Sequence, residues 1–186
     1  MNSHTRRGGT AALTLLLLAP AVGGQDRPAA LPYAIPGHGR LNLSVPAGWR
    51  VTSKALAQPP SLNLRFGPSS GDGFSLQVTA VWLDADKLAN TTQASLKATA
   101  IRSAEGPLRQ AVEKAAVIQD LRGAQSAGFF FSLTDRAPPP GEYKYLTQGT
   151  YLTGEVMVVF TLLHREMPSP EKEQAIRMLT DSTHSK

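Results

Sequence analysis

Residues 74–82 read FSLQVTAVW, and this stretch decides the fold class because nearly every second residue is large and apolar. Side chains of a β-strand point alternately to the two faces of its sheet, so this period of two predicts a half-buried strand. A shorter stretch with the same alternation, residues 62–66, precedes it across a loop rich in glycine and serine. The two stretches are predicted to form a β-hairpin.

Further strands are predicted on both sides of this hairpin. Residues 41–45 alternate in the same way, and residues 156–163 are apolar at nearly every position. A continuous apolar run of this length is typical of a central strand that is covered on both faces. The remaining candidate strands are residues 116–121, 128–133 and 143–152.

Two helices are predicted between and after these strands. Residues 87–105 lack glycine and proline and carry a narrow apolar stripe at every fourth position. Asp84 or Asp86 can cap this helix, because a side-chain oxygen accepts the free amide hydrogens at a helix start. The second helix is predicted to begin with Ser169 as its N-cap and Pro170 at its first position. The four residues at the end of the chain are expected to fray.

The order of these elements is strands, helix, strands, helix. Segregated strands and helices predict an α+β fold, in which helices pack on a mainly antiparallel β-sheet to give two or three layers.

The N-terminal part of the chain has the pattern of an export signal. Two arginines precede an apolar run at residues 10–21, and small residues follow it. The run is too short for a membrane-spanning helix, which needs about 20 residues, so residues 1–24 are predicted to be a cleaved signal peptide. Residues 25–39 are predicted to be a linker rich in proline and glycine, and residues 40–183 a single α+β domain.

The charge and the cysteine content limit which partners and which stabilising bonds the protein can have. Removal of Arg6 and Arg7 with the signal peptide lowers the net charge from +5 to +3, and the other basic residues are scattered among acids. Nucleic-acid binding needs basic residues that cluster on one face, so no nucleic-acid partner is predicted. The chain has no cysteine, so the domain must fold on its core alone. The expected location is the periplasm or the outside of the cell, with no transmembrane segment in the mature chain.

The segment from Val45 to Trp49 reads VPAGW and follows the strand predicted at residues 41–45. Together with the long strand at 74–82, its following helix, and the late strand pair before the last helix, it resembles the Mog1/PsbP-like fold family. Exported bacterial proteins related to DcrB belong to this family. The resemblance covers roughly residues 40–183. It implies a docking, assembly or chaperone role rather than catalysis, and it transfers no binding residue to this chain.

The sequence offers no catalytic or metal-binding motif. His164 is predicted to be an exposed residue at a strand end, since a zinc site needs three or four converging ligands. Asp84 and Asp86 have the spacing of a calcium loop, but the rest of that pattern is absent and helix capping explains them better. No cofactor is predicted.

Two segments are candidate partner surfaces. Tyr143, Tyr145 and Tyr151 fall on one face of a predicted strand, and exposed aromatics of this kind are enriched at interfaces. The alternative, that these rings cover the core under a helix, is favoured because most strand aromatics are packing residues. The proline-rich loop 135–141 with Glu142 is the second candidate, and its alternative is a plain connector.

Three functions remain as hypotheses. The first is a non-enzymatic periplasmic protein that binds another cell-envelope component or assists its assembly. The second is a carrier of a small ligand or lipid in a cavity between sheet and helices. The third and least favoured is a hydrolase with an unrecognised site. The sequence leaves the oligomeric state open.

Overall fold

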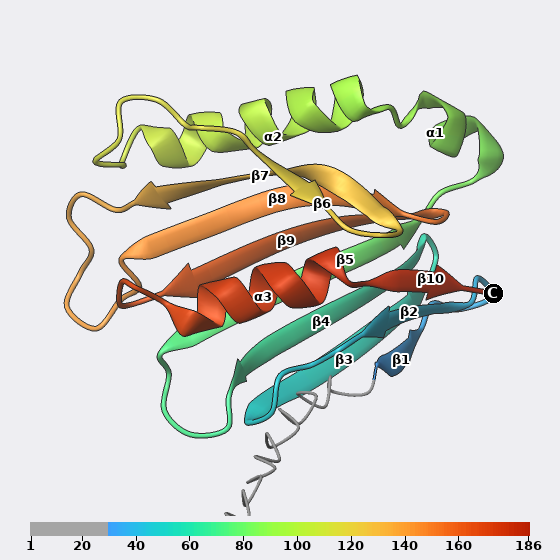
Figure 1. Ribbon diagram of the computed structural model, residues 1–186, viewed down its shortest axis with the longest axis horizontal. Coiled ribbons are helices and arrows are strands. Elements are labelled where there is room, and N and C mark those ends of the chain that lie inside the picture. Colours follow the sequence, from blue (N-terminus) through green and yellow to red (C-terminus); the bar gives the residue numbers. More distant parts are fainter. Residues whose placement is uncertain (1–29) are drawn as a thin grey trace, which may run out of the picture.

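A computed structural model of the protein describes residues 30–186. Its main feature is a seven-stranded antiparallel sheet with the strand order β3-β4-β5-β9-β8-β7-β6 (Figure 1). The strands are β3 (Trp49–Ala57), β4 (Pro60–Pro68), β5 (Phe74–Trp82), β6 (Gln119–Arg122), β7 (Ser126–Thr134), β8 (Tyr145–Thr153) and β9 (Val156–His164). The predicted α+β class and the mainly antiparallel sheet are confirmed.

A second, three-stranded sheet has the order β1-β2-β10. Its strands are β1 (Leu31–Ala34), β2 (Arg40–Leu43) and β10 (Thr183–Ser185). The sequence predicted a linker over residues 25–39, but residues 31–34 form β1, and Ile35 is buried. The end of the chain was expected to fray, but it pairs with β2 as β10. The predicted signal peptide, residues 1–24, lies outside the described part of the chain.

The helices are α1 (Ala85–Asn90), α2 (Gln93–Leu108) and α3 (Pro170–Thr180). The single helix predicted at residues 87–105 is therefore two helices. The break comes at Thr92, which turns into an extended conformation and caps α2 in a capping box with Ser95. Ser169 caps α3 and Pro170 is its first residue, as the sequence predicted.

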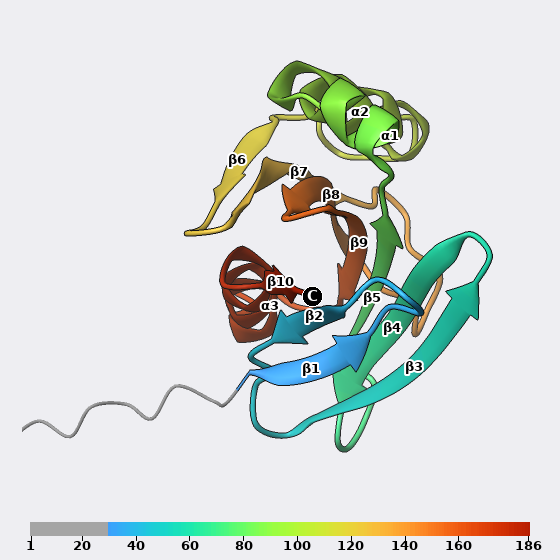
Figure 2. The ribbon, with the colours of Figure 1, turned by 90° about the vertical axis from the view of Figure 1, so that its right-hand side faces the viewer.

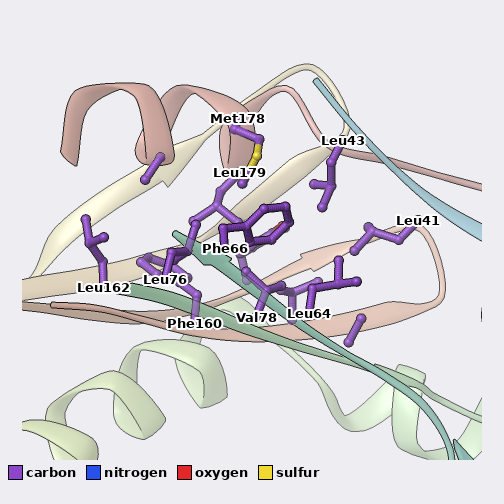
Figure 3. Close-up of a cluster of buried hydrophobic side chains, with 14 of the residues drawn as sticks. Leu41, Leu43, Leu64, Phe66, Leu76, Val78, Phe160, Leu162, Met178 and Leu179 are labelled. Carbon is purple, nitrogen blue, oxygen red and sulfur yellow. The ribbon is translucent and has the colours of Figure 1, made fainter. Parts of the chain in front are cut away.

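The large sheet curls around α3 and the small sheet, while α2 lies on its opposite side (Figure 2). We call the side toward α3 the inner face and the opposite side the outer face. The main core fills the inner face, where Leu43 of β2, Phe66 of β4, Phe160 of β9 and Leu179 of α3 are almost fully buried (Figure 3). α2 packs mainly on the outer face of β7 and β8, through Leu96, Ala100 and Ala104.

Candidate functional site

The outer face of β3, β4 and β5 has no helix over it within residues 30–186 (Figure 2). Strand register identifies the residues of this face: Thr52 of β3 lies opposite Arg65 of β4, and Arg65 lies opposite Gln77 of β5. All three side chains are exposed. This part of the sheet therefore presents a polar surface to solvent, in contrast to the apolar outer face under α2.

Three cations gather on this surface. Arg50 and Lys54 lie two residues to either side of Thr52 on β3, so both are diagonal neighbours of Arg65 on β4. Diagonal neighbours on one face of an antiparallel sheet are about 7–8 Å apart, within reach of long side chains. The basic residues were expected to be scattered among acids, but the edge of the sheet concentrates three of them at one place.

None of these cations forms an ion pair with another residue of the described range 30–186. Arg50 Nε donates a hydrogen bond to the carbonyl oxygen of Pro68 at 2.8 Å, which holds the guanidinium in place without neutralising it. The carboxylate that lines the groove, that of Asp72, is already paired with Arg165, whose Nη2 lies 2.6 Å from Oδ2. The local positive potential is consequently available to an external anion.

The cations line a shallow groove made of two adjoining hollows. The first, of about 360 Å³, runs past Lys54, Asn63 and Gln77. The second, of about 280 Å³, runs past Arg50 to Asp72 and Tyr143. Thr52 and Arg65 line both hollows, so they join into one feature. We call it the cationic groove and define it by Arg50, Lys54, Arg65, Gln77 and Tyr143.

The structure separates the three tyrosines that were considered together as a partner surface. Tyr143 is half-buried at the end of the cationic groove, with the guanidinium carbon of Arg165 5.2 Å from its ring centre. Tyr145 stacks on His164, with ring centroids 5.1 Å apart. Tyr151 is fully buried in the main core. Of the three, Tyr151 cannot contact a partner, because α3 and the small sheet cover the inner face at its position.

His164 was expected at the surface, but it is only 2 % exposed. Its side chain lies on the inner face of the sheet, toward α3. Its Nδ1 lies 3.0 Å from the carbonyl oxygen of Glu166. A carbonyl oxygen only accepts, so Nδ1 carries the hydrogen of this bond. Burial lowers the pKa of His164 below its usual value, because desolvation disfavours the charged imidazolium.

The remaining candidates have structural roles. Asp84 caps α1 by accepting a hydrogen bond from the amide of Lys87 at 2.9 Å, and the hydrogen bond from the Lys87 side chain helps hold the pKa of Asp84 below its usual value. In the loop 135–141, Asp135 Oδ1 accepts from the amide of Ala137 at 2.9 Å. Among residues 30–186 no three histidine, aspartate or glutamate side chains converge as metal ligands, and no helix is long and apolar enough to cross a membrane.

Comparison with known proteins identifies a structural likeness to the fold of this chain. No family model and no curated protein sequence matches the chain. The solution structure of cyanobacterial PsbP (CyanoP) from Synechocystis sp. PCC 6803 superimposes with a TM-score of 0.52 at 12% identity, covering 91% of this chain and 99% of that one. This chain has the Mog1/PsbP-like fold. The predicted resemblance to that fold is confirmed.

A protein of Bacteroides thetaiotaomicron VPI-5482 also matches, with a TM-score of 0.46 and 12% identity over 78% of this chain. This chain spans 45% of the length of that protein. At 12% identity, the similarity to CyanoP bears on the fold alone, so the function must be argued from the site.

The cations of the groove could not be predicted as a cluster because the sequence pattern does not predict β3. Residues 50–54 read RVTSK, in which Arg50, Thr52 and Lys54 share one face of an extended chain. Apolar residues alternate too weakly here to predict a half-buried strand. The feature that could have indicated β3 is its hairpin with β4. Residues 49–57 and 60–68 form two strands of equal length on either side of Gln58 and Pro59.

Proposed function

We propose that this chain is a non-enzymatic protein of the periplasm or cell exterior that binds an acidic surface of another cell-envelope component through its cationic groove. The observation that carries the proposal is the cluster of Arg50, Lys54 and Arg65 on an uncovered sheet face, with no ion pair to any residue of the range 30–186. Like charges that lie close together destabilise a folded sheet, so retaining them suits a surface that meets an anion.

The shape of the groove favours a macromolecular partner over a small ligand. Small-molecule sites are concave and bury most of the ligand surface in a largely apolar pocket of about 300–1,000 Å³. The cationic groove is instead open and lined by exposed charged and polar side chains such as Lys54, Arg65 and Gln77. The open, polar groove therefore favours binding of a macromolecular partner over the hypothesis that the protein carries a small ligand or lipid. The hydrolase hypothesis has no supporting observation, since the groove holds one carboxylate, Asp72, which is paired with Arg165.

The location in the envelope rests on the sequence of residues 1–24, which lie outside the described range. A positively charged start, an apolar run and small residues are the three parts of a secretory signal. The partner that we propose is accordingly another component of the same compartment.

The proposal is tested by recovering the partner from the native cell envelope with charge variants of the groove. The tagged protein is crosslinked mildly, purified, and its companions are identified by mass spectrometry. The binding variant carries Arg50→Gln, Lys54→Gln and Arg65→Gln. The control variant carries Arg102→Gln, Arg109→Gln and Lys114→Gln, which remove the same charge from exposed positions on α2 and just after it.

We expect a partner that wild type and control recover and the groove variant loses. With the partner purified, raising the salt concentration should weaken its complex with wild type more steeply than its complex with the groove variant. A partner recovered equally by all three proteins would overturn the proposal, as would an association insensitive to salt.

A further inference from the structure

β3 is an edge strand whose outer backbone groups have no partner within residues 30–186. Two bonds at its start fix which groups point outward. The carbonyl oxygen of Gly48 accepts from the amide of Ser69, on the β4 side, at 2.8 Å, whereas the amide of Trp49 turns the other way and donates to Pro46 at 3.3 Å. Backbone direction alternates along a strand, so residues 51, 53 and 55 direct their N–H and C=O groups away from β4.

Within residues 30–186, the other edge strands contain a proline or are only three or four residues long, whereas β3 is long and contains no proline. Natural proteins shield sheet edges with proline, charge, bulges or short strands. β1 contains Pro32, β10 has 3 residues, and β6 has 4 residues with Asp120 and Arg122 exposed. β3 has 9 residues in unbroken register with β4 and contains no proline. Its backbone edge is therefore long and regular enough to pair with another strand. The charges on β3, Arg50 and Lys54, are both positive, so they deter a basic strand but not an acidic one.

The charge of the side chains beside this edge determines which kind of strand can pair with it. The outer-face residues of β3 are Arg50, Thr52 and Lys54, and they lie at the positions where a strand added to the edge would form its non-hydrogen-bonded pairs. Side chains approach most closely in such pairs, at a Cα separation of about 4.5 Å. Acidic residues at alternate positions of the added strand would face Arg50 and Lys54, with Arg65 one strand behind.

We propose that an extended acidic segment of the partner protein adds to the large sheet as a strand beside β3. This rests on the proposed function, and it names how the partner binds: main-chain hydrogen bonds to residues 51, 53 and 55 supply the pairing, and the cations supply its selectivity. Proteins that extend a sheet in this way gain affinity from the backbone and specificity from alternate side chains.

A second copy of this chain is a poorer occupant of the same edge. In an antiparallel pairing of two β3 strands centred on Thr52, Arg50 of each copy stands directly opposite Lys54 of the other. When the pairing is centred one residue earlier or later, Arg50 of one copy is diagonal to Lys54 of the other. Like charges in these positions destabilise a strand pair, so the edge favours an acidic segment over self-association.

The test separates strand pairing from charge. Ser53→Pro and Ala55→Pro each remove an outward N–H and leave the bonds to β4 and all three cations in place, since proline is tolerated on the free side of an edge strand. The ligand is a synthetic peptide that alternates glutamate with valine, with a lysine-for-glutamate version as its charge control. Binding is measured by calorimetry, and exchange of the amides of residues 51, 53 and 55 is followed by NMR.

We expect wild type to bind the glutamate peptide and protect these three amides from exchange, and the lysine peptide to fail. Each proline variant should bind about tenfold more weakly or worse. A second measurement does not alter the protein: methylating the peptide nitrogens along the edge that pairs with β3 should abolish binding, whereas methylating those of the opposite edge should not.

Binding that resists both proline variants and peptide methylation would overturn strand addition while leaving the charge-based proposed function intact. Binding that is lost with proline but unchanged in the variant that carries Arg50→Gln, Lys54→Gln and Arg65→Gln would instead overturn the proposed function, and with it the acidic character of the added strand. Absence of any binding to the glutamate peptide would overturn the inference outright.

Discussion

The imidazole ring of His38 stacks on the indole ring of Trp82, with centroids 3.7 Å apart and an angle of 19° between the ring planes. His38 lies in the turn before β2, and Trp82 ends β5, so this contact joins the small sheet to the large one. His184 of β10 binds the same turn through its Nε2, 2.8 Å from the carbonyl oxygen of His38. Trp82 Nε1 donates in turn to Glu155 at 3.3 Å.

Trp82→Ala is therefore expected to loosen the small sheet and lower the free energy of unfolding by about 2 kcal/mol, since a half-buried aromatic contributes both area and stacking. The control is Lys186→Ala. It breaks the ion pair of Lys186 Nζ with Glu155 Oε1, 2.6 Å long, but the lysine is 78% exposed and such pairs contribute about 0–1 kcal/mol. Urea denaturation measures both, and faster hydrogen exchange at Leu41 and Leu43 would locate the effect. Equal losses in the two variants would contradict the role of the stack.

Substitution of Tyr151 tests whether this tyrosine belongs to the core and contributes to stability, unlike Tyr143. Its hydroxyl lies 3.0 Å from that of Ser182, and Ser182 Oγ also lies 2.7 Å from the carbonyl oxygen of Leu179. Ser182 has one hydroxyl hydrogen, so when it donates to Leu179, Tyr151 is the donor of the pair. Tyr151→Phe leaves one buried hydrogen-bonding position empty.

We expect Tyr151→Phe to lower the free energy of unfolding by about 1–2 kcal/mol. Tyr143→Phe, at the half-buried end of the cationic groove, should change it by less than about 0.5 kcal/mol. Thermal denaturation followed by circular dichroism measures both. A larger loss in Tyr143→Phe than in Tyr151→Phe would mean that the hydroxyl of Tyr143 contributes more to stability than that of Tyr151.

The parts of the fold that the sequence predicted are those with local causes. The strand at residues 74–82 has the same bounds in the sequence pattern and in the structure, because its alternation reflects one buried face. The start of α3 follows from Ser169 and Pro170, whose effects reach only one helical turn. In both cases the residues that determine the element lie within it.

The parts that the sequence did not predict depend on distant contacts. β10 exists because Thr183 lies opposite Asn42, far away in the chain, and Asn42 Nδ2 donates to Thr183 Oγ1 at 3.2 Å. His164 looked exposed because charged residues follow it, yet α3 returns to cover it. The candidate site was missed for a related reason. An edge strand needs few apolar residues, so Arg50 and Lys54 stood in a segment without a strand pattern.

His164 predicts how stability depends on pH. Its neighbours are Tyr145 of β8, which stacks on it, and Lys172 and Glu171 of α3, of which the lysine disfavours and the glutamate favours the imidazolium. Burial is the largest influence and lowers the pKa of the folded-state imidazole below 6.5. Between the two pKa values the unfolded chain binds a proton that the folded chain does not, so stability must fall as pH falls below 6.5.

The measurement is the urea midpoint of wild type and His164→Gln between about pH 7.5 and 5.5, a window above the usual carboxylate pKa values. Wild type should lose stability as the pH falls through this window, whereas the variant should stay nearly constant, whatever its stability at the upper end. Parallel decline of the two proteins would show that another group is responsible. Above the window, titration of His164 should have no effect.

Arg65 gives a prediction that distinguishes a binding residue from a structural one. It has Arg50 and Lys54 as diagonal neighbours and no ion pair within residues 30–186, so its charge is expected to cost stability. Arg65→Gln should leave the free energy of unfolding unchanged or raise it by up to about 0.5 kcal/mol, while it weakens binding of the acidic partner.

Salt provides an internal check, because it screens repulsion between exposed charges. Between about 0.02 M and 0.5 M sodium chloride, the melting temperature of wild type should rise more than that of Arg65→Gln. Arg165→Gln is the matched control, since it breaks the pair with Asp72 and should lower stability slightly. Should Arg65→Gln instead lower stability by more than about 1 kcal/mol, Arg65 would have a packing role, and the claim that its charge serves a partner would lose its support.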